Sequence, residues 1–97
     1  MTFKRLYKII LSRKKSLPKK SYVASLIKDG RDRIAQKVGE EAVEVIIAAG
    51  NNKNQKQRLV EEISDLFFHI LVLMVANDIS IEDIEGELEK RCGQNQV

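Results

Sequence analysis

Two amphipathic segments joined by a short polar stretch restrict this chain more than any other feature. Apolar residues recur at helical spacing over residues 31–49 and again over residues 55–77, with the asparagine-rich stretch 51–54 between them. A connection this short predicts two helices that pack antiparallel. Within residues 66–76 only His69 interrupts the apolar run, so we expect this half of the second helix to be buried on most sides.

The same spacing predicts three flanking helices. A first helix over residues 2–14 precedes a loop over residues 15–20 that holds Pro18, and Ser21 caps a second helix that ends at Asp29–Gly30. Ser80 starts the last helix with Asp83 as an approximate capping box, and residues 92–97 form a frayed tail. One stripe of the 31–49 helix is predicted to face the core, with Ile46 widening it: Ile34, Val38, Ala42, Val45 and Ala49.

Size and composition make this a single all-α domain over residues 1–97, an antiparallel helical hairpin core with flanking helices. A chain of 97 residues buries a limited core, so the apolar half of the 55–77 helix predicts a homo-oligomeric helical bundle, a dimer or higher. The longest apolar run, residues 70–76, is too short to cross a membrane. The single cysteine, Cys92, excludes an internal disulfide and a cysteine zinc cluster, which suits the cytoplasm.

Charge is distributed unevenly along the chain. Residues 1–28 carry nine lysines or arginines and no acid, whereas residues 29–97 carry eight basic and all fourteen acidic residues, a net charge of −6. The basic segment, residues 1–20 above all, is either a solvated helix face, a partner for the acidic part or a surface for an anionic ligand. It matches no nucleic-acid-binding motif and holds only Phe3, Tyr7 and Tyr22 as aromatics, so nucleic acid is not the expected partner.

Six carboxylates stand inside the two apolar helices, as Glu40, Glu41, Glu44 and as Glu61, Glu62, Asp65. Residues three or four apart share a helix face, and an antiparallel hairpin brings the two clusters to one level. Converging carboxylates repel one another unless a hard divalent cation binds them, and Mg²⁺ with carboxylates and phosphates is such an arrangement. The alternative is an ordinary charged face, but no lysine follows these acids at a spacing of four.

Three neighbours of the acids have two readings each. Lys37 stands one turn before the first cluster, where it either meets phosphate charge or is simply solvated. Gly39 either is tolerated in mid-helix or permits close approach by a backbone or a ligand. His69 lacks the spacing of a di-iron ligand, so we interpret it as a hydrogen-bonded helix histidine.

The acidic pattern, Glu40-Glu41-x-x-Glu44 followed by Glu62-x-x-Asp65, resembles the all-α MazG-like nucleoside triphosphate pyrophosphohydrolase superfamily. More narrowly, the run from Ile34 to Glu44 and the Ser21-Tyr22 segment resemble the phosphoribosyl-ATP pyrophosphatase family over about residues 3–91. The resemblance implies Mg²⁺-dependent hydrolysis of phosphoribosyl-ATP to phosphoribosyl-AMP and pyrophosphate in histidine biosynthesis, with Mn²⁺ as a substitute ion. Some relatives are fused to a cyclohydrolase whose zinc site needs several cysteines, so a single cysteine implies the pyrophosphatase alone.

The resemblance also implies roles for single residues. Metal would be bound by Glu41, Glu44, Glu62 and Asp65. Glu40 and Glu61 would be auxiliary catalytic groups, either as further ligands or by orienting water. Substrate phosphates or ribose would be contacted by Lys37, Ser21, Tyr22 and Lys28. Two alternatives stay open: a pyrophosphatase of a free (deoxy)nucleoside triphosphate, and a non-catalytic helical oligomerisation or nucleic-acid-binding module.

Overall fold

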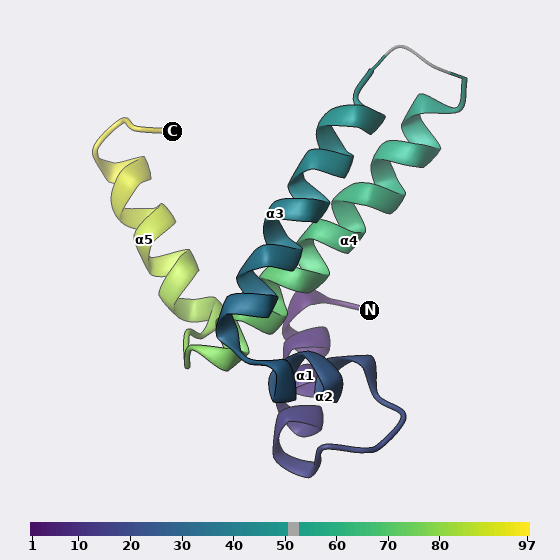
Figure 1. Cartoon of the computed structure of the whole chain (residues 1–97). Helices are drawn as coiled ribbons and strands as arrows, with labels where there is room; N and C mark the ends of the chain where they lie inside the picture. Colours follow the sequence, from purple (N-terminus) through teal and green to yellow (C-terminus); the bar gives the residue numbers. More distant parts are fainter. Residues whose placement is uncertain (51–52) are drawn as a thin grey trace.

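The computed structural model describes residues 1–50 and 53–97, and all regular structure within them is helical (Figure 1). The predicted all-α class is therefore confirmed. The predicted connection over residues 51–54 includes residues 51 and 52, which lie outside the described residues. In chain order the helices are α1 (Phe3–Ser16), α2 (Tyr22–Asp29), α3 (Arg31–Ala48), α4 (Gln55–Ala76) and α5 (Ile81–Gly93).

Local side-chain chemistry explains where α1 begins and ends. The Thr2 hydroxyl accepts a hydrogen bond from the backbone N–H of Arg5 at 3.1 Å and so caps the helix. The helix runs to Ser16, two residues beyond the predicted end, so the predicted loop is wrong for residues 15–16. The chain leaves the helix only at Leu17, where the following Pro18 disfavours right-handed helical angles. Leu17 takes a left-handed conformation with φ 49°.

The joint between α2 and α3 matches the expected signals. The Ser21 hydroxyl accepts a hydrogen bond from the backbone N–H of Ala24 at 3.2 Å, as predicted for an N-cap. Gly30 ends α2 and precedes α3 directly, with φ 102°, a backbone conformation that side chains with a Cβ rarely adopt. The glycine thus lets two helices meet at a sharp angle without an intervening loop.

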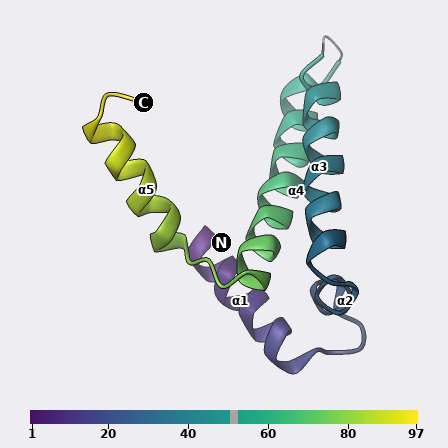
Figure 2. The same cartoon turned by 60° about the vertical axis from the view of Figure 1, so that its left-hand side comes forward.

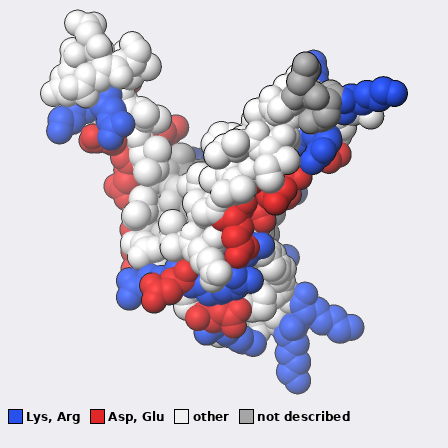
Figure 3. Space-filling view, turned by 45° about the horizontal axis from the view of Figure 1, so that its top comes forward, with Lys and Arg blue, Asp and Glu red and all other residues white. Residues whose placement is uncertain are grey.

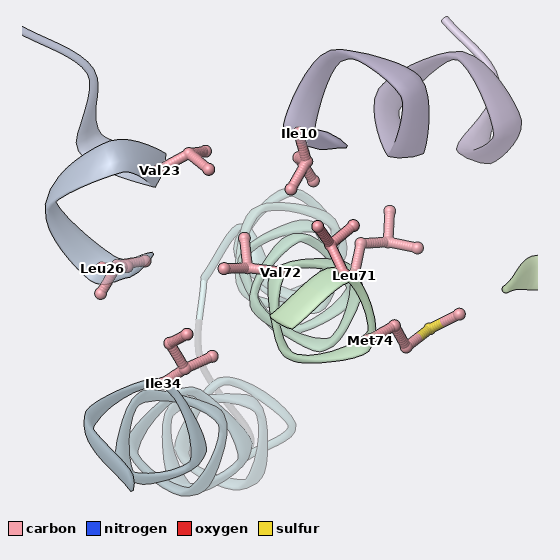
Figure 4. Packing of buried hydrophobic residues seen from close by; sticks show 8 residues of the cluster. Ile10, Val23, Leu26, Ile34, Leu71, Val72 and Met74 are labelled. Carbon is pink, nitrogen blue, oxygen red and sulfur yellow. The ribbon is translucent and has the colours of Figure 1, made fainter. Parts of the chain in front are cut away.

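The core lies at the base of the hairpin that α3 and α4 form, where α1 and α2 pack against it (Figures 1 and 4). Ile10 of α1, Ile34 of α3 and Val72 of α4 are fully buried there. The predicted stripe of α3 is right at Ile34 but wrong near its end. Ala48 is buried instead of Ala49, because α3 turns a slightly different face to α4 than periodicity indicated. The remaining members of the core cluster are Val23, Leu26, Leu71, Met74 and Val75.

Beyond this base the hairpin carries many exposed apolar side chains. Ile46, which was expected to widen the buried stripe, is 72% exposed in the single chain, so that expectation is wrong. Phe67 is 44% exposed, so the second half of α4 is buried on fewer sides than predicted. Other exposed apolar residues of the hairpin are Val43, Ile47, Val60 and Ile63.

Helix α5 extends away from the hairpin as a separate arm (Figures 1 and 2). Its start is capped as predicted, since the Ser80 hydroxyl accepts from the Asp83 N–H at 3.0 Å and the Asp83 carboxylate accepts from the Ser80 N–H at 2.9 Å. The Tyr7 hydroxyl anchors the turn before it by donating to the carbonyl of Ile79 at 2.8 Å. The helix includes residues 92–93, so the predicted frayed tail begins two residues too early.

The α3–α4 hairpin and helix α5 form two arms that give the chain an open shape. Its Cα radius of gyration is 15.1 Å, whereas a compact domain of 100 residues has about 13 Å. None of the helices in the described ranges is both long and apolar enough to span a membrane.

Candidate metal centre

Three carboxylates from the two hairpin helices converge in the middle of the hairpin. One oxygen each from Glu41 of α3 and from Glu62 and Asp65 of α4 lie within 4.8 Å of one another. Glu62 and Asp65 share one face of α4 because they are three residues apart, and the antiparallel packing of α3 brings Glu41 opposite them. Acidic side chains gather along this part of the hairpin in Figure 3.

The cluster is electrostatically strained as an isolated group of acids. Partial burial raises the pKa of Glu62, and the nearby charges of Asp65, Glu44 and Glu41 raise it further, while Arg58 opposes them. Burial and the three acidic neighbours disfavour the charged carboxylate of Glu62, whereas Arg58 favours it. A positive charge placed among these oxygens would remove that conflict.

Lys37 already supplies one positive charge beside the cluster. Its ammonium lies 3.3 Å from a carboxylate oxygen of Glu40 and 3.3 Å from one of Glu41. The hydrogen bond to Glu41 raises the pKa of Lys37, with burial opposing and Glu40 adding to the increase. The absence of lysines after the acids was correct, but a lysine precedes Glu41 by four residues and pairs with it, which the spacing argument overlooked.

The other predicted acids stand outside the close group. Glu44 is near enough to raise the pKa of Glu62, yet its oxygens are not among those that converge within 4.8 Å. Glu40 pairs with Lys37 and also lies 3.6 Å from the guanidinium of Arg33. Glu61 accepts a hydrogen bond from the Gln57 side chain at 3.0 Å on its own helix.

The predicted substrate-binding residues belong to α2 or precede it. The Ser21 hydroxyl oxygen accepts the hydrogen bond that caps α2, and Lys28 is exposed in the last turn of that helix. The Tyr22 side chain is half exposed, and its hydroxyl lies 2.8 Å from Nε2 of His69. Tyr22 also contributes to the raised pKa of Lys37.

His69 is hydrogen-bonded at both ring nitrogens, as its interpretation as a satisfied helix histidine required. Its Nδ1 lies 2.7 Å from the carbonyl oxygen of Asp65, one turn earlier, and the side chain is 6% exposed. Sequence reasoning missed its partner Tyr22, because the two residues are 47 positions apart and no spacing rule joins them. The contact of Arg33 with Glu40 was missed for a different reason, since it spans seven residues on one helix.

The oxygens present fit a hard divalent cation. Oxygens that bind the same Mg²⁺ lie about 3 to 4.2 Å apart, given bond lengths of about 2.1 Å and octahedral geometry. The three converging oxygens lie within 4.8 Å of one another, and Asp65 is exposed, so small side-chain rotations would close the difference. Such a centre can neutralise phosphate oxygens and polarise a phosphoanhydride.

Comparison with known proteins adds an independent line of evidence. Over 87 residues the chain is 55% identical to a phosphoribosyl-ATP pyrophosphatase of Leptospira biflexa serovar Patoc, covering 90% of this chain and 92% of that protein. A phosphoribosyl-ATP pyrophosphatase of Sulfolobus acidocaldarius is 48% identical over 87 residues, 90% of each chain. The histidine biosynthesis bifunctional protein HisIE of Thermotoga maritima is 44% identical over 86 residues, 89% of this chain and 43% of that longer protein.

The sequence model of the phosphoribosyl-ATP pyrophosphohydrolase family matches residues 3–92, nearly the whole chain. The match covers helices α1 to α4 completely and all but the last residue of α5, and it includes all three converging carboxylates. The chain therefore belongs to the phosphoribosyl-ATP pyrophosphohydrolase family.

Proposed function

We propose that this protein hydrolyses phosphoribosyl-ATP to phosphoribosyl-AMP and pyrophosphate, a reaction of histidine biosynthesis, with Mg²⁺ as cofactor. The observation that carries the proposal is the convergence of Glu41, Glu62 and Asp65 in a chain that belongs to this family. The proposal includes a cytoplasmic location, which the single cysteine and the biosynthetic names of the relatives support.

Glu41, Glu62 and Asp65 would hold the metal, and Glu44 would join them as the fourth carboxylate. Glu44 is already close enough to act on the charge of Glu62. When bound, Mg²⁺ supplies positive charge that neutralises the phosphate chain and polarises the bond to be broken. The half-buried position of Glu41 and Glu62 excludes part of the surrounding water, which strengthens their interaction with a cation.

Lys37 would bind the substrate phosphates. In the structure its ammonium is divided between Glu40 and Glu41. If Glu41 binds the metal, the Lys37 ammonium would keep Glu40 as its carboxylate partner. Its remaining N–H groups could then donate to a phosphate oxygen. Lys28 is exposed and could add a contact to the substrate from α2. The Ser21 oxygen accepts the capping hydrogen bond, so its hydroxyl proton could be donated to the substrate.

Glu40 and Glu61 would act as auxiliary groups that orient the attacking water or complete the ligand set. Each is exposed and is held by a neighbour on its own helix, Glu40 by Lys37 and Glu61 by Gln57. These contacts fix the carboxylates without burying them, so water can reach both. Replacing each by glutamine separates the roles, since a water-orienting group affects kcat while a metal ligand affects Mg²⁺ affinity.

The protein would act as a homo-oligomer. The hairpin exposes several apolar side chains, and an open apolar groove of about 380 Å³ between α4 and α5 includes Phe67, Ile84 and Leu88. The facing surfaces of the two arms are largely uncharged in Figure 3. A second copy of the chain would bury this surface. Sedimentation that shows a monomer at micromolar concentration would contradict the oligomer without affecting the proposed chemistry.

The decisive experiment measures pyrophosphate release from phosphoribosyl-ATP with and without Mg²⁺. We expect release only with the metal, and we expect Glu62→Gln to abolish it while the helical circular dichroism spectrum is unchanged. Glu89→Gln on the distant arm α5 is the matched control and should keep full activity. No release by the wild-type protein, or release only from free nucleoside triphosphates, would refute the proposed substrate.

A further inference from the structure

The contact between Tyr22 and His69 links α2 to the helix that carries two of the clustered acids. The Tyr22 hydroxyl lies 2.8 Å from Nε2 of His69, and Nδ1 of His69 lies 2.7 Å from the carbonyl oxygen of Asp65. His69 is 6% exposed, whereas Tyr22 is 50% exposed. One end of this chain of contacts is therefore fixed inside the protein, and the other faces solvent.

The chemistry of the contacts determines where the protons lie. A backbone carbonyl can only accept a hydrogen bond, so Nδ1 of His69 must carry the ring proton that reaches Asp65. In the neutral ring Nε2 then has only a lone pair, and it must accept the proton of the Tyr22 hydroxyl. The single hydroxyl proton of Tyr22 is thereby committed to His69.

This commitment leaves the Tyr22 oxygen with only lone pairs to offer to a further partner. Such an oxygen accepts hydrogen bonds and cannot donate one, so it does not suit phosphate oxygens, which are acceptors themselves. It suits a donor, and the hydroxyl groups of a ribose are donors. The position agrees, because Tyr22 is joined through His69 to the backbone of Asp65, one of the three residues whose carboxylates converge.

We propose that His69 is a positioning residue that fixes the Tyr22 hydroxyl as a hydrogen-bond acceptor for a ribose hydroxyl of the substrate. The substrate part of this inference rests on the proposed function. The tautomer of neutral His69 does not, because the carbonyl of Asp65 can only accept a hydrogen bond from Nδ1.

The first test is nitrogen NMR of the imidazole ring, which is unambiguous because the chain has one histidine. We expect the ¹⁵N shifts and couplings of the tautomer that carries its proton on Nδ1, in the protein without substrate. Tyr22→Phe should shift the Nε2 resonance more than the Nδ1 resonance. A proton on Nε2 would overturn the inference, whether or not the protein hydrolyses phosphoribosyl-ATP.

The second test separates KM from kcat for phosphoribosyl-ATP. Loss of one hydrogen bond to the substrate should raise KM of Tyr22→Phe about tenfold and leave kcat within about twofold. Tyr7→Phe is the matched control, since it removes the other tyrosine hydroxyl of the chain, which donates to Ile79 near α5. An unchanged KM in Tyr22→Phe would overturn the substrate contact.

His69 variants test whether it acts through Tyr22. His69→Asn keeps a donor near Asp65 but cannot reach the Tyr22 hydroxyl, so its KM should rise as in Tyr22→Phe. His69→Gln places an amide oxygen near the position of Nε2 and should restore a KM within about twofold of the wild type. In the Tyr22→Phe background His69→Asn should add nothing to KM. If the effects of the two substitutions on KM were fully additive, His69 would act independently of Tyr22 and the positioning role would be overturned. Circular dichroism checks that each variant is folded.

Discussion

Replacing Lys37 by methionine should lower the folding stability of the metal-free protein and raise its affinity for Mg²⁺. Methionine keeps most of the length of the side chain and removes its charge. The ammonium lies 3.3 Å from an oxygen of Glu41, and the two side chains are only 19% and 14% exposed. The charge removed is therefore one that solvent screens incompletely.

The size of the effect follows from this geometry. Two unit charges 3.3 Å apart attract by about 1.3 kcal/mol in bulk water and by about 5 kcal/mol at an effective dielectric constant of 20. Desolvation and side-chain ordering oppose most of this attraction, so a net contribution of about 1 kcal/mol to folding stability is the appropriate estimate. For a domain of this size, that loss lowers Tm by about 4–8 °C.

Metal binding should respond in the opposite direction. In the wild-type protein Mg²⁺ competes with the Lys37 ammonium for Glu41, and the variant removes this competitor. A competing interaction of about 1 kcal/mol corresponds to Mg²⁺ binding that is about fivefold tighter. Pyrophosphate release should nevertheless fall, because the proposed phosphate contact is lost.

Isothermal titration calorimetry with MgCl₂ and thermal unfolding with and without Mg²⁺ measure these effects. Lys90→Met on the arm α5 is the matched control and should leave both measurements unchanged. Weaker Mg²⁺ binding by Lys37→Met would refute the reasoning, since it would mean that the ion does not compete with this ammonium for Glu41.

Three further perturbations test other parts of the structure. The raised pKa of Glu62 means that the folded metal-free protein holds the proton of this carboxyl more tightly than the unfolded chain does. The stability of the folded protein should therefore fall as the pH rises from the ordinary pKa of a glutamate through the raised pKa of Glu62. Calorimetry over the same pH range should show the opposite trend for Mg²⁺ affinity, which rises as the competing proton leaves, and a flat profile would contradict both. Gly39→Ala should raise the free energy of unfolding by about 0.5–1 kcal/mol in urea titration, because a Cβ there meets no atom within 4 Å; a loss of stability would reveal a partner backbone at that position. Ile34→Ala should cost about 2–5 kcal/mol in the same titration, since Ile34 is fully buried in the core cluster, and a cost under 1 kcal/mol would place the core elsewhere.

Signals that act within one turn of helix were readable from the sequence with few errors. Ser21 and Ser80 cap the helices predicted for them, because each cap joins atoms only three residues apart. Gly30 marks a helix end because few other residues adopt its backbone angles. The end of α1 was placed two residues early, because Pro18 disfavours helical angles only at Leu17, directly before it, and leaves residues 15–16 able to be helical.

The candidate site was predictable to the level of helix faces. The spacing of the acids indicated a convergence across an antiparallel hairpin, and Glu41, Glu62 and Asp65 do converge. Which acids come closest depends on how α3 is rotated against α4, and a periodic pattern leaves that rotation uncertain by about one residue position. The same uncertainty explains why Ala48 is buried in place of Ala49.

The sequence by itself determined five amphipathic helices, their capped ends and an acidic pair of segments with the spacing of a metal centre, because each depends on neighbours along the chain. Only the tertiary structure decided that α5 leaves the hairpin as an arm, that Lys37 is divided between two acids, and that Tyr22 reaches His69. Contacts between residues 47 positions apart follow from the packing of whole helices, and a linear pattern records the faces that pack but not the atoms that meet.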